Sequence, residues 1–207
     1  MQKEPKNKAI IDFFKKNGGY ARMKELKDAS FHTRDIAKLI QNGILERIKP
    51  GIYRLSEIAV NGDEYFQMVD ICTAFPKAVI CLASALDMYD LSTFYPSEMY
   101  VAVPHNTRIP KIEYPPMRVF FFNEKCYKLG IETVKARYGQ FNVYDTEKTI
   151  CDMFKYRKKI GEDLAIEGLQ NYMRTRKGRD LNKLMKYADV CRVKAVMSPY
   201  IKAILEQ

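Results

Sequence analysis

The chain has 207 residues, of which 47% are hydrophobic and 29% are charged, and it carries a formal net charge of +10. This composition is typical of a globular protein and excludes a mainly disordered one, while the lack of any run of about 18 uncharged apolar residues excludes a membrane-spanning helix. The polar start of the chain lacks the apolar segment and small-residue cleavage site of a secretory signal, so we expect a cytoplasmic protein.

The positive charge is concentrated in the amino-terminal quarter. Residues 1–58 hold 13 Lys and Arg against 7 Asp and Glu, a net charge of +6, which leaves +4 for residues 59–207. Basic surfaces attract polyanions such as nucleic acids. The amino-terminal quarter is therefore the first place where the sequence predicts such a contact.

The chain begins with three short predicted helices. Apolar residues recur at helical spacing over residues 6–16, and Asn17-Gly18-Gly19 ends that helix. A second helix is predicted over residues 21–29 and is followed by a tight turn. Thr33 is the expected N-cap of the third helix, because its hydroxyl can accept a hydrogen bond from a first-turn amide, and Asn42-Gly43 is its expected stop.

The third helix is predicted to have one apolar and one basic face. Ile36 and Leu39 lie on the side expected to be buried, whereas Arg34 and Lys38 fall on the opposite side. The basic face is therefore expected to be free to meet DNA.

A β-hairpin is predicted next, because residues 44–55 form two β-rich runs joined by a Lys-Pro-Gly turn. Residues 56–60 are expected to continue it. Three helices followed by a basic hairpin are the pattern of a winged helix-turn-helix, in which one helix enters the major groove and the hairpin meets phosphates. The sequence therefore predicts a winged helix-turn-helix DNA-binding domain over residues 1–60.

The predicted DNA contacts divide between the third helix and the hairpin. The side chains expected near base edges lie on the helix or just after it, and they are Thr33, Arg34, Lys38 and Asn42. Those expected at phosphates or in the minor groove lie on the hairpin, and they are Arg47, Lys49 and Arg54. The alternative is a docking module for another protein, in which the same basic side chains only face solvent.

The rest of the chain, residues 61–207, is predicted to be a mixed α+β domain that starts at Asn61-Gly62-Asp63, with Asp63 capping a helix. Helices are expected at residues 64–75 and 80–89, and strands at 99–103, 117–122 and twice within 130–144, with 117–122 as a buried strand. Four amphipathic helices follow, starting near residues 146, 161, 181 and 194. The predicted fold class of the whole chain is α+β, with a small sheet and helices gathered at the end.

Sequence motifs of phosphate-binding loops, zinc proteases and serine hydrolases are absent, so we expect no enzyme activity, no cofactor and no metal site. The densest charged cluster comprises Asp145, Glu147, Lys148 and Asp152. We interpret Asp145 as a helix cap, Glu147 as a side chain that favours the positive end of the helix, and the others as solvated. The alternative is a metal-dependent nuclease, in which the winged helix delivers DNA to Asp145, Glu147 and Asp152.

The cysteines are widely spaced and odd in number, so we expect buried thiols rather than disulfides or metal ligands. They are Cys72, Cys81, Cys126, Cys151 and Cys191. A separate basic run near a predicted helix end contains Lys155, Arg157, Lys158 and Lys159, and a second run contains Arg174, Arg176, Lys177 and Arg179. Cations at helix C-termini are favoured by the helix dipole alone, and the functional alternative is a second contact with DNA or RNA.

Five segments carry a resemblance to a known family: GILERIKPGIYRL at 43–55, ICLASAL at 80–86, YVAVP at 100–104, YDTEKTICD at 144–152 and FKYRKKIG at 154–161. Together they resemble the AbiEi antitoxins of type IV toxin-antitoxin and phage-abortive-infection loci. The resemblance implies a winged-helix repressor fused to an antitoxin domain, which represses its own operon by binding upstream inverted repeats of double-stranded DNA.

The resemblance also implies a partner gene that encodes a nucleotidyltransferase toxin. This chain lacks a Gly-Ser followed by an Asp-x-Asp metal pair, so it would be the antitoxin. Such antitoxins oppose the toxin without a lasting complex, so a stable heterodimer is not implied, and a homodimer on DNA is one arrangement that suits inverted repeats. Family members can be longer, which leaves two roles open for the second domain: full antitoxin activity, or chiefly DNA binding and self-association.

Overall fold

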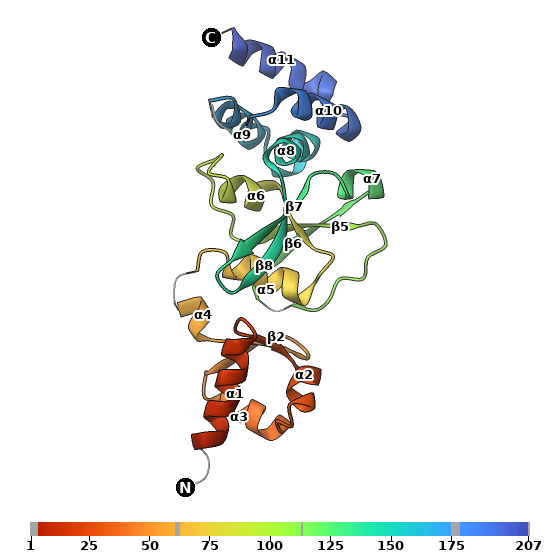
Figure 1. The fold of residues 1–207 in the computed structure, drawn as a ribbon. Coiled ribbons are helices and arrows are strands. Elements are labelled where there is room, and N and C mark those ends of the chain that lie inside the picture. The colour runs from red at the N-terminus through yellow and green to blue at the C-terminus, as the bar shows by residue number, and fades with distance from the viewer. Residues whose placement is uncertain (1–3, 61–62, 113, 175–178, 207) are drawn as a thin grey trace. The chain divides into compact units, whose positions relative to one another are not determined.

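The computed structural model describes residues 4–60, 63–112, 114–174 and 179–206 (Figure 1). The chain divides into two compact units, which we call the amino-terminal unit (residues 1–76, 109–115 and 135–141) and the carboxy-terminal unit (residues 77–108, 116–134 and 142–207). Asn61 and Gly62, at the domain boundary predicted from the sequence, lie outside the described residues. No helix in the described part of the chain is both long enough and apolar enough to cross a membrane.

The amino-terminal unit begins with three helices and a three-stranded sheet. In chain order these are α1 (Glu4–Lys16), β1 (Tyr20–Arg22), α2 (Met23–Asp28), α3 (Thr33–Gln41), β2 (Leu45–Lys49) and β3 (Ile52–Leu55). The sheet has the order β1-β3-β2, and both pairings are antiparallel. Two further helices, α4 (Glu57–Val60) and α5 (Phe66–Ala74), follow the hairpin.

The three predicted helices and the hairpin are present. The first and third helices end just before the glycine-containing turns predicted from the sequence. Gly43 and Gly51, after α3 and between β2 and β3, have φ angles of 70° and 84°, which glycine adopts without steric cost. Phe14, Leu26 and Leu39 contribute one fully buried side chain from each helix. Each helix therefore has a buried apolar side, as its amphipathic pattern predicts.

Three local predictions in this unit are wrong. Arg22 and the residue before it lie in β1 rather than in a helix, because they pair with β3, a partner that is distant in the sequence. Thr33 is the first residue of α3, whereas His32 is the cap residue and makes no side-chain cap bond. Residues 57–60 form α4 instead of extending the hairpin, and Ile58 is fully buried.

A buried polar network ties the small sheet to α5. The Tyr20 hydroxyl donates to Asp70 Oδ1 at 2.7 Å, and Arg54 Nη1 lies 3.4 Å from Asp70 Oδ2. Arg54 Nη2 donates to the Glu46 carboxylate, and Arg54 Cζ lies 5.0 Å from the centre of the Phe66 ring. Since Asp70 is fully buried, its carboxylate depends on Arg54 for charge balance.

The Asp70 carboxyl is expected to make folding pH-dependent. Burial raises its pKa to about 6, although Arg54 opposes the shift. A raised pKa in the folded state gives a stabilisation that is complete below about pH 4 and is lost as the pH rises through about 6. We therefore predict that the unfolding free energy of the native protein, relative to Asp70→Asn, falls between about pH 4 and about pH 7 in urea denaturation. A difference that does not change with pH would contradict this.

The remainder of the chain combines a five-stranded sheet with helices. The strands are β4 (Val79–Ile80), β5 (Met99–Pro104), β6 (Met117–Phe122), β7 (Ile131–Ala136) and β8 (Gly139–Tyr144), in the order β6-β5-β4-β8-β7. The helices are α6 (Leu82–Met88), α7 (Glu124–Tyr127), α8 (Thr146–Ile160), α9 (Glu162–Arg174), α10 (Leu181–Cys191) and α11 (Lys194–Leu205). The predicted α+β class is confirmed, with a sheet followed by a helical group.

The core of the carboxy-terminal unit forms around α8, which packs against α6, α9 and α10 (Figure 1). Ile150 and Phe154 on α8 are fully buried in it. Within the described residues all five cysteines are buried and outside any disulfide, which confirms their predicted burial.

Some predicted element bounds in the second part of the chain need correction. The helix expected from residue 64 begins at Phe66, and Asp63 accepts a hydrogen bond from the Tyr65 amide in the preceding turn. The helix expected from residue 80 begins at Leu82, because Ile80 lies in β4. The strand β6 is an edge strand with alternating burial rather than a fully buried one, and its Phe121 is 41% exposed.

Candidate nucleic-acid interface

The helix α3 presents a basic face to solvent. Arg34 and Lys38 are four residues apart, which places them on one side of the helix, and both are exposed. Thr33 and Asn42, at the two ends of the same helix, are also exposed. All four base-contact residues predicted from the sequence therefore lie on one accessible element.

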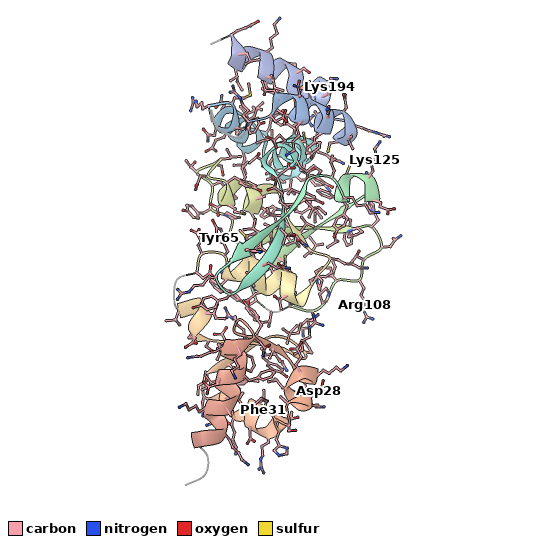
Figure 2. The ribbon with its side chains drawn as sticks, viewed as in Figure 1. Asp28, Phe31, Tyr65, Arg108, Lys125 and Lys194 are labelled. Carbon is pink, nitrogen blue, oxygen red and sulfur yellow. The ribbon has the colours of Figure 1, made fainter. Side chains whose placement is uncertain are left out.

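Apolar packing fixes α3 from behind. Ile36 and Leu39 on its inner side are buried, and α3 packs against β2. The turn before α3 is held by Phe31, whose ring meets the Phe13 ring of α1 edge-on at 5.5 Å (Figure 2). The basic face is therefore presented by a rigid helix rather than a loop, as specific recognition requires.

The start of α1 extends this basic face. A hollow of about 260 Å³ is lined by Lys6 and Asn7 of α1 together with Asp35, Lys38 and Asn42. The sequence analysis did not include Lys6 or Asn7 among the contacts. The lysines at the start of the first helix could have indicated this position. We add Lys6 to the candidate contacts, because its exposed ammonium shares the hollow with Lys38.

The hairpin agrees only in part with its predicted role. Arg47 on β2 is exposed, as a phosphate contact requires. Lys49 is half-buried, and its ammonium donates to the carbonyl oxygen of Ala74. Arg54 is 1% exposed and is held by Glu46 and Asp70, so its predicted phosphate contact is wrong.

The first basic run lies at the end of α8. Lys158 and Lys159 are exposed, whereas Lys155 and Arg157 are half-buried. Arg157 donates to the carbonyl oxygen of Phe154 at 2.8 Å, so its side chain is held against the preceding turn of its own helix. The run thus includes cations that complement the helix end, as the dipole interpretation expects, and others that are free for a ligand.

The second basic run lies after α9 and is described only in part. Arg174 is exposed, and Arg179 donates through Nη1 to the carbonyl oxygen of Met173. Arg176 and Lys177 lie outside the described residues. The described part of this run therefore contributes a backbone contact rather than a cluster of free cations.

The charged cluster at the start of α8 is buried, which corrects the expectation of solvated side chains. Asp145 caps the helix as predicted, since its Oδ1 accepts from the Lys148 amide at 2.8 Å. Its Oδ2 lies 3.1 Å from Lys183 Nζ, which also lies 3.0 Å from Glu147 Oε2. The Lys148 ammonium is paired with Asp152, and both are fully buried. The helix start is therefore held by ion pairs inside the unit.

These pairings bear on the nuclease alternative. Burial works to raise the pKa of Glu147, but hydrogen bonds from Lys183 and Tyr172 outweigh it and lower that pKa. The Asp152 carboxylate keeps the pKa of Lys148 above its usual value in spite of burial. In the part of the chain that the structure describes, no three His, Cys, Asp or Glu side chains are grouped so as to hold a metal. The carboxylates of this cluster serve as internal partners of lysines.

Comparison with known proteins finds a family match for the first part of the chain. Residues 8–56 match the family described as transcriptional regulator, AbiEi antitoxin. The matched segment starts within α1 and ends just after β3, so it contains α3 and the hairpin and covers about a quarter of the chain. A search of curated proteins found no match to the chain.

Proposed function

We propose, from the membership of residues 8–56 in the AbiEi antitoxin family of transcriptional regulators, that this chain is a DNA-binding repressor and the antitoxin of a type IV toxin-antitoxin system. The observation that carries the proposal is that the matched segment contains the exposed basic face of α3. Regulators of transcription that bind operators place such a helix in the major groove.

The order of elements supports a winged helix-turn-helix. The segment runs α1-β1-α2-α3-β2-β3, with α3 as the groove-reading helix and the β2–β3 hairpin as the wing. Arg34 and Lys38 can bond to guanine edges, and Asn42 to adenine. Arg47 on the wing and Lys6 on α1 reach phosphates on either side of the groove.

Regulation of its own operon follows from this role. We propose that the protein binds an upstream inverted repeat as a homodimer and lowers transcription of its own gene and of a neighbouring nucleotidyltransferase toxin gene. The second domain, residues 61–207, would oppose that toxin in the cytoplasm without a lasting complex and without catalysis. This places DNA binding and antitoxin activity in different parts of the chain.

The repressor role is tested with a reporter gene behind the native upstream region. Co-expression of the chain is expected to lower reporter output, because the bound dimer would occlude the promoter. Scrambling the inverted repeat should abolish the effect and serves as the control. Unchanged output from the native region would contradict the repressor role.

The antitoxin role is tested by expressing the adjacent gene. If that gene encodes a nucleotidyltransferase that arrests growth, co-expression of this chain is expected to restore growth. Purified toxin and antitoxin should then elute separately from a sizing column. Growth arrest that persists with the chain present would remove the antitoxin role while leaving the repressor role intact.

Two substitutions should separate base reading from phosphate binding. Arg34→Ala is expected to lower the preference for the operator by about 10- to 100-fold, because a bidentate base contact contributes about 1–3 kcal/mol of discrimination. Arg47→Ala should instead weaken binding to all duplexes and reduce the salt dependence by about one unit of slope. Fluorescence anisotropy with operator and random duplex at several salt concentrations distinguishes the two.

The matched control is Lys186→Ala, which removes an exposed positive charge from α10. It is expected to leave both affinity and preference unchanged. An equal loss for Lys186→Ala and Arg34→Ala would mean that net charge, rather than the α3 face, governs binding.

A further inference from the structure

The carboxy-terminal unit contains a separate basic hollow of about 630 Å³. Its cationic lining comes from four side chains: Lys125, Lys155, Arg157 and Arg192. Lys125 extends from α7 (Figure 2), Lys155 and Arg157 lie on α8, and Arg192 follows α10. Three elements that are distant in the sequence therefore direct cations toward one concavity.

The positive charge of this hollow is only partly balanced. Of the described residues that line it, Asp189 alone is acidic, and its carboxylate lies 2.9 Å from Lys194 Nζ. Arg157 forms an ion pair with Glu162, in which Arg157 Nε lies 3.4 Å from Glu162 Oε1. Lys155 Nζ lies 3.4 Å from the Cys126 sulfur. The hollow therefore has an excess of positive charge.

Helix-end electrostatics account for only part of this arrangement. Arg192 stands at the C-terminus of α10, where the dipole favours a cation. Lys125 belongs to a different, short helix, and Lys155 lies in the interior of α8. The left-handed backbone of Arg192, with φ at 62°, is a common way for a helix to end. The helix dipole therefore accounts for Arg192 but not for Lys155.

We infer that this hollow binds a small phosphorylated compound that carries more than one phosphate group. Its volume falls within the range of small-molecule sites, about 300–1,000 Å³. Arginine forks and lysine ammoniums are the groups that bind phosphate oxygens through charge-assisted hydrogen bonds. A concave site with converging cations suits a compact anion, whereas the extended backbone of a nucleic acid suits an exposed face such as that of α3. None of the residues of α1, α3 and the hairpin that we propose to contact DNA lines this hollow.

The test is isothermal titration calorimetry of the full chain with inorganic triphosphate, at fixed ionic strength of about 0.1 M. Saturable binding is expected, and Lys125→Ala and Arg192→Ala are each expected to weaken it about 10-fold or more, because each removes a charge-assisted hydrogen bond. Both side chains are exposed, so the variants should fold normally, which circular dichroism checks. Lys186→Ala, an exposed charge outside the hollow, is the matched control and should bind like the native protein.

A short single-stranded RNA without a terminal phosphate provides the second arm. Binding of that RNA with no heat from triphosphate would overturn the inference, as would triphosphate binding that Lys125→Ala and Arg192→Ala leave unchanged. The result is independent of operator binding, because Arg34→Ala is expected to bind triphosphate like the native protein. Failure of the DNA role and failure of this site are therefore distinguishable.

Discussion

Arg54→Ala is expected to lower the free energy of unfolding of the amino-terminal unit by about 3–5 kcal/mol, because it leaves the buried Asp70 carboxylate without its cation. The same change also removes the bond to Glu46 and the contact with the Phe66 ring. Urea denaturation followed by circular dichroism measures the loss. A stability effect of this size would identify Arg54 as a structural residue.

Arg47→Ala is the matched control, since it removes an arginine from the exposed side of the same hairpin. Its unfolding free energy is expected to change by less than about 0.5 kcal/mol. If the Arg54→Ala protein were as stable as the native one and yet bound DNA more weakly, the structural role would be contradicted. The phosphate contact predicted from the sequence would then be supported.

Lys148→Ala should have an effect of similar size in the carboxy-terminal unit. The Lys148 ammonium is paired with Asp152 and lies 4.1 Å from the centre of the Tyr144 ring and 4.7 Å from that of Phe122. Removing it leaves a fully buried carboxylate without its paired cation, at an expected cost of about 3–5 kcal/mol in unfolding free energy. Thermal or urea denaturation of the full chain measures this.

The double variant Lys148→Met with Asp152→Leu separates loss of charge balance from loss of packing. Because both charges are removed together, it is expected to be more stable than Lys148→Ala. Lys159→Ala, on the exposed side of the same helix, should change stability by less than about 0.5 kcal/mol. Equal stability of Lys148→Ala and Lys159→Ala would contradict the role of the buried pair.

The parts of the fold that the sequence predicts well are those determined by local patterns. The amphipathic period and the Asp145 cap place α8 correctly, and Gly43 and Gly51 mark the ends of α3 and of β2. The strands β1 and β4 were missed, because they have three and two residues and form only by pairing with strands far along the chain. Such pairing leaves no periodic signal in a short segment.

The candidate interface was predicted to a similar extent. The helical period alone identifies the exposed side of α3, so the exposure of Arg34 and Lys38 was predicted correctly, whereas their contact with DNA stays a prediction. Arg54 was misassigned because all four residues of β3 are buried, and the partner that neutralises Arg54 comes from α5, sixteen residues later. Lys148 and Asp152 were expected in solvent for the same reason, since the residues beside them belong to other elements, such as Phe122 beside Lys148 and Cys191 beside Asp152.

We propose that α3 and the β2–β3 hairpin together read a specific DNA sequence. The most direct test is an equilibrium competition, at one fixed salt concentration, between the inverted repeat upstream of the gene and a scrambled duplex of equal length for the full-length protein. The proposed role predicts that the inverted repeat binds at least about 10³-fold more tightly. Equal affinity for the two duplexes would contradict it.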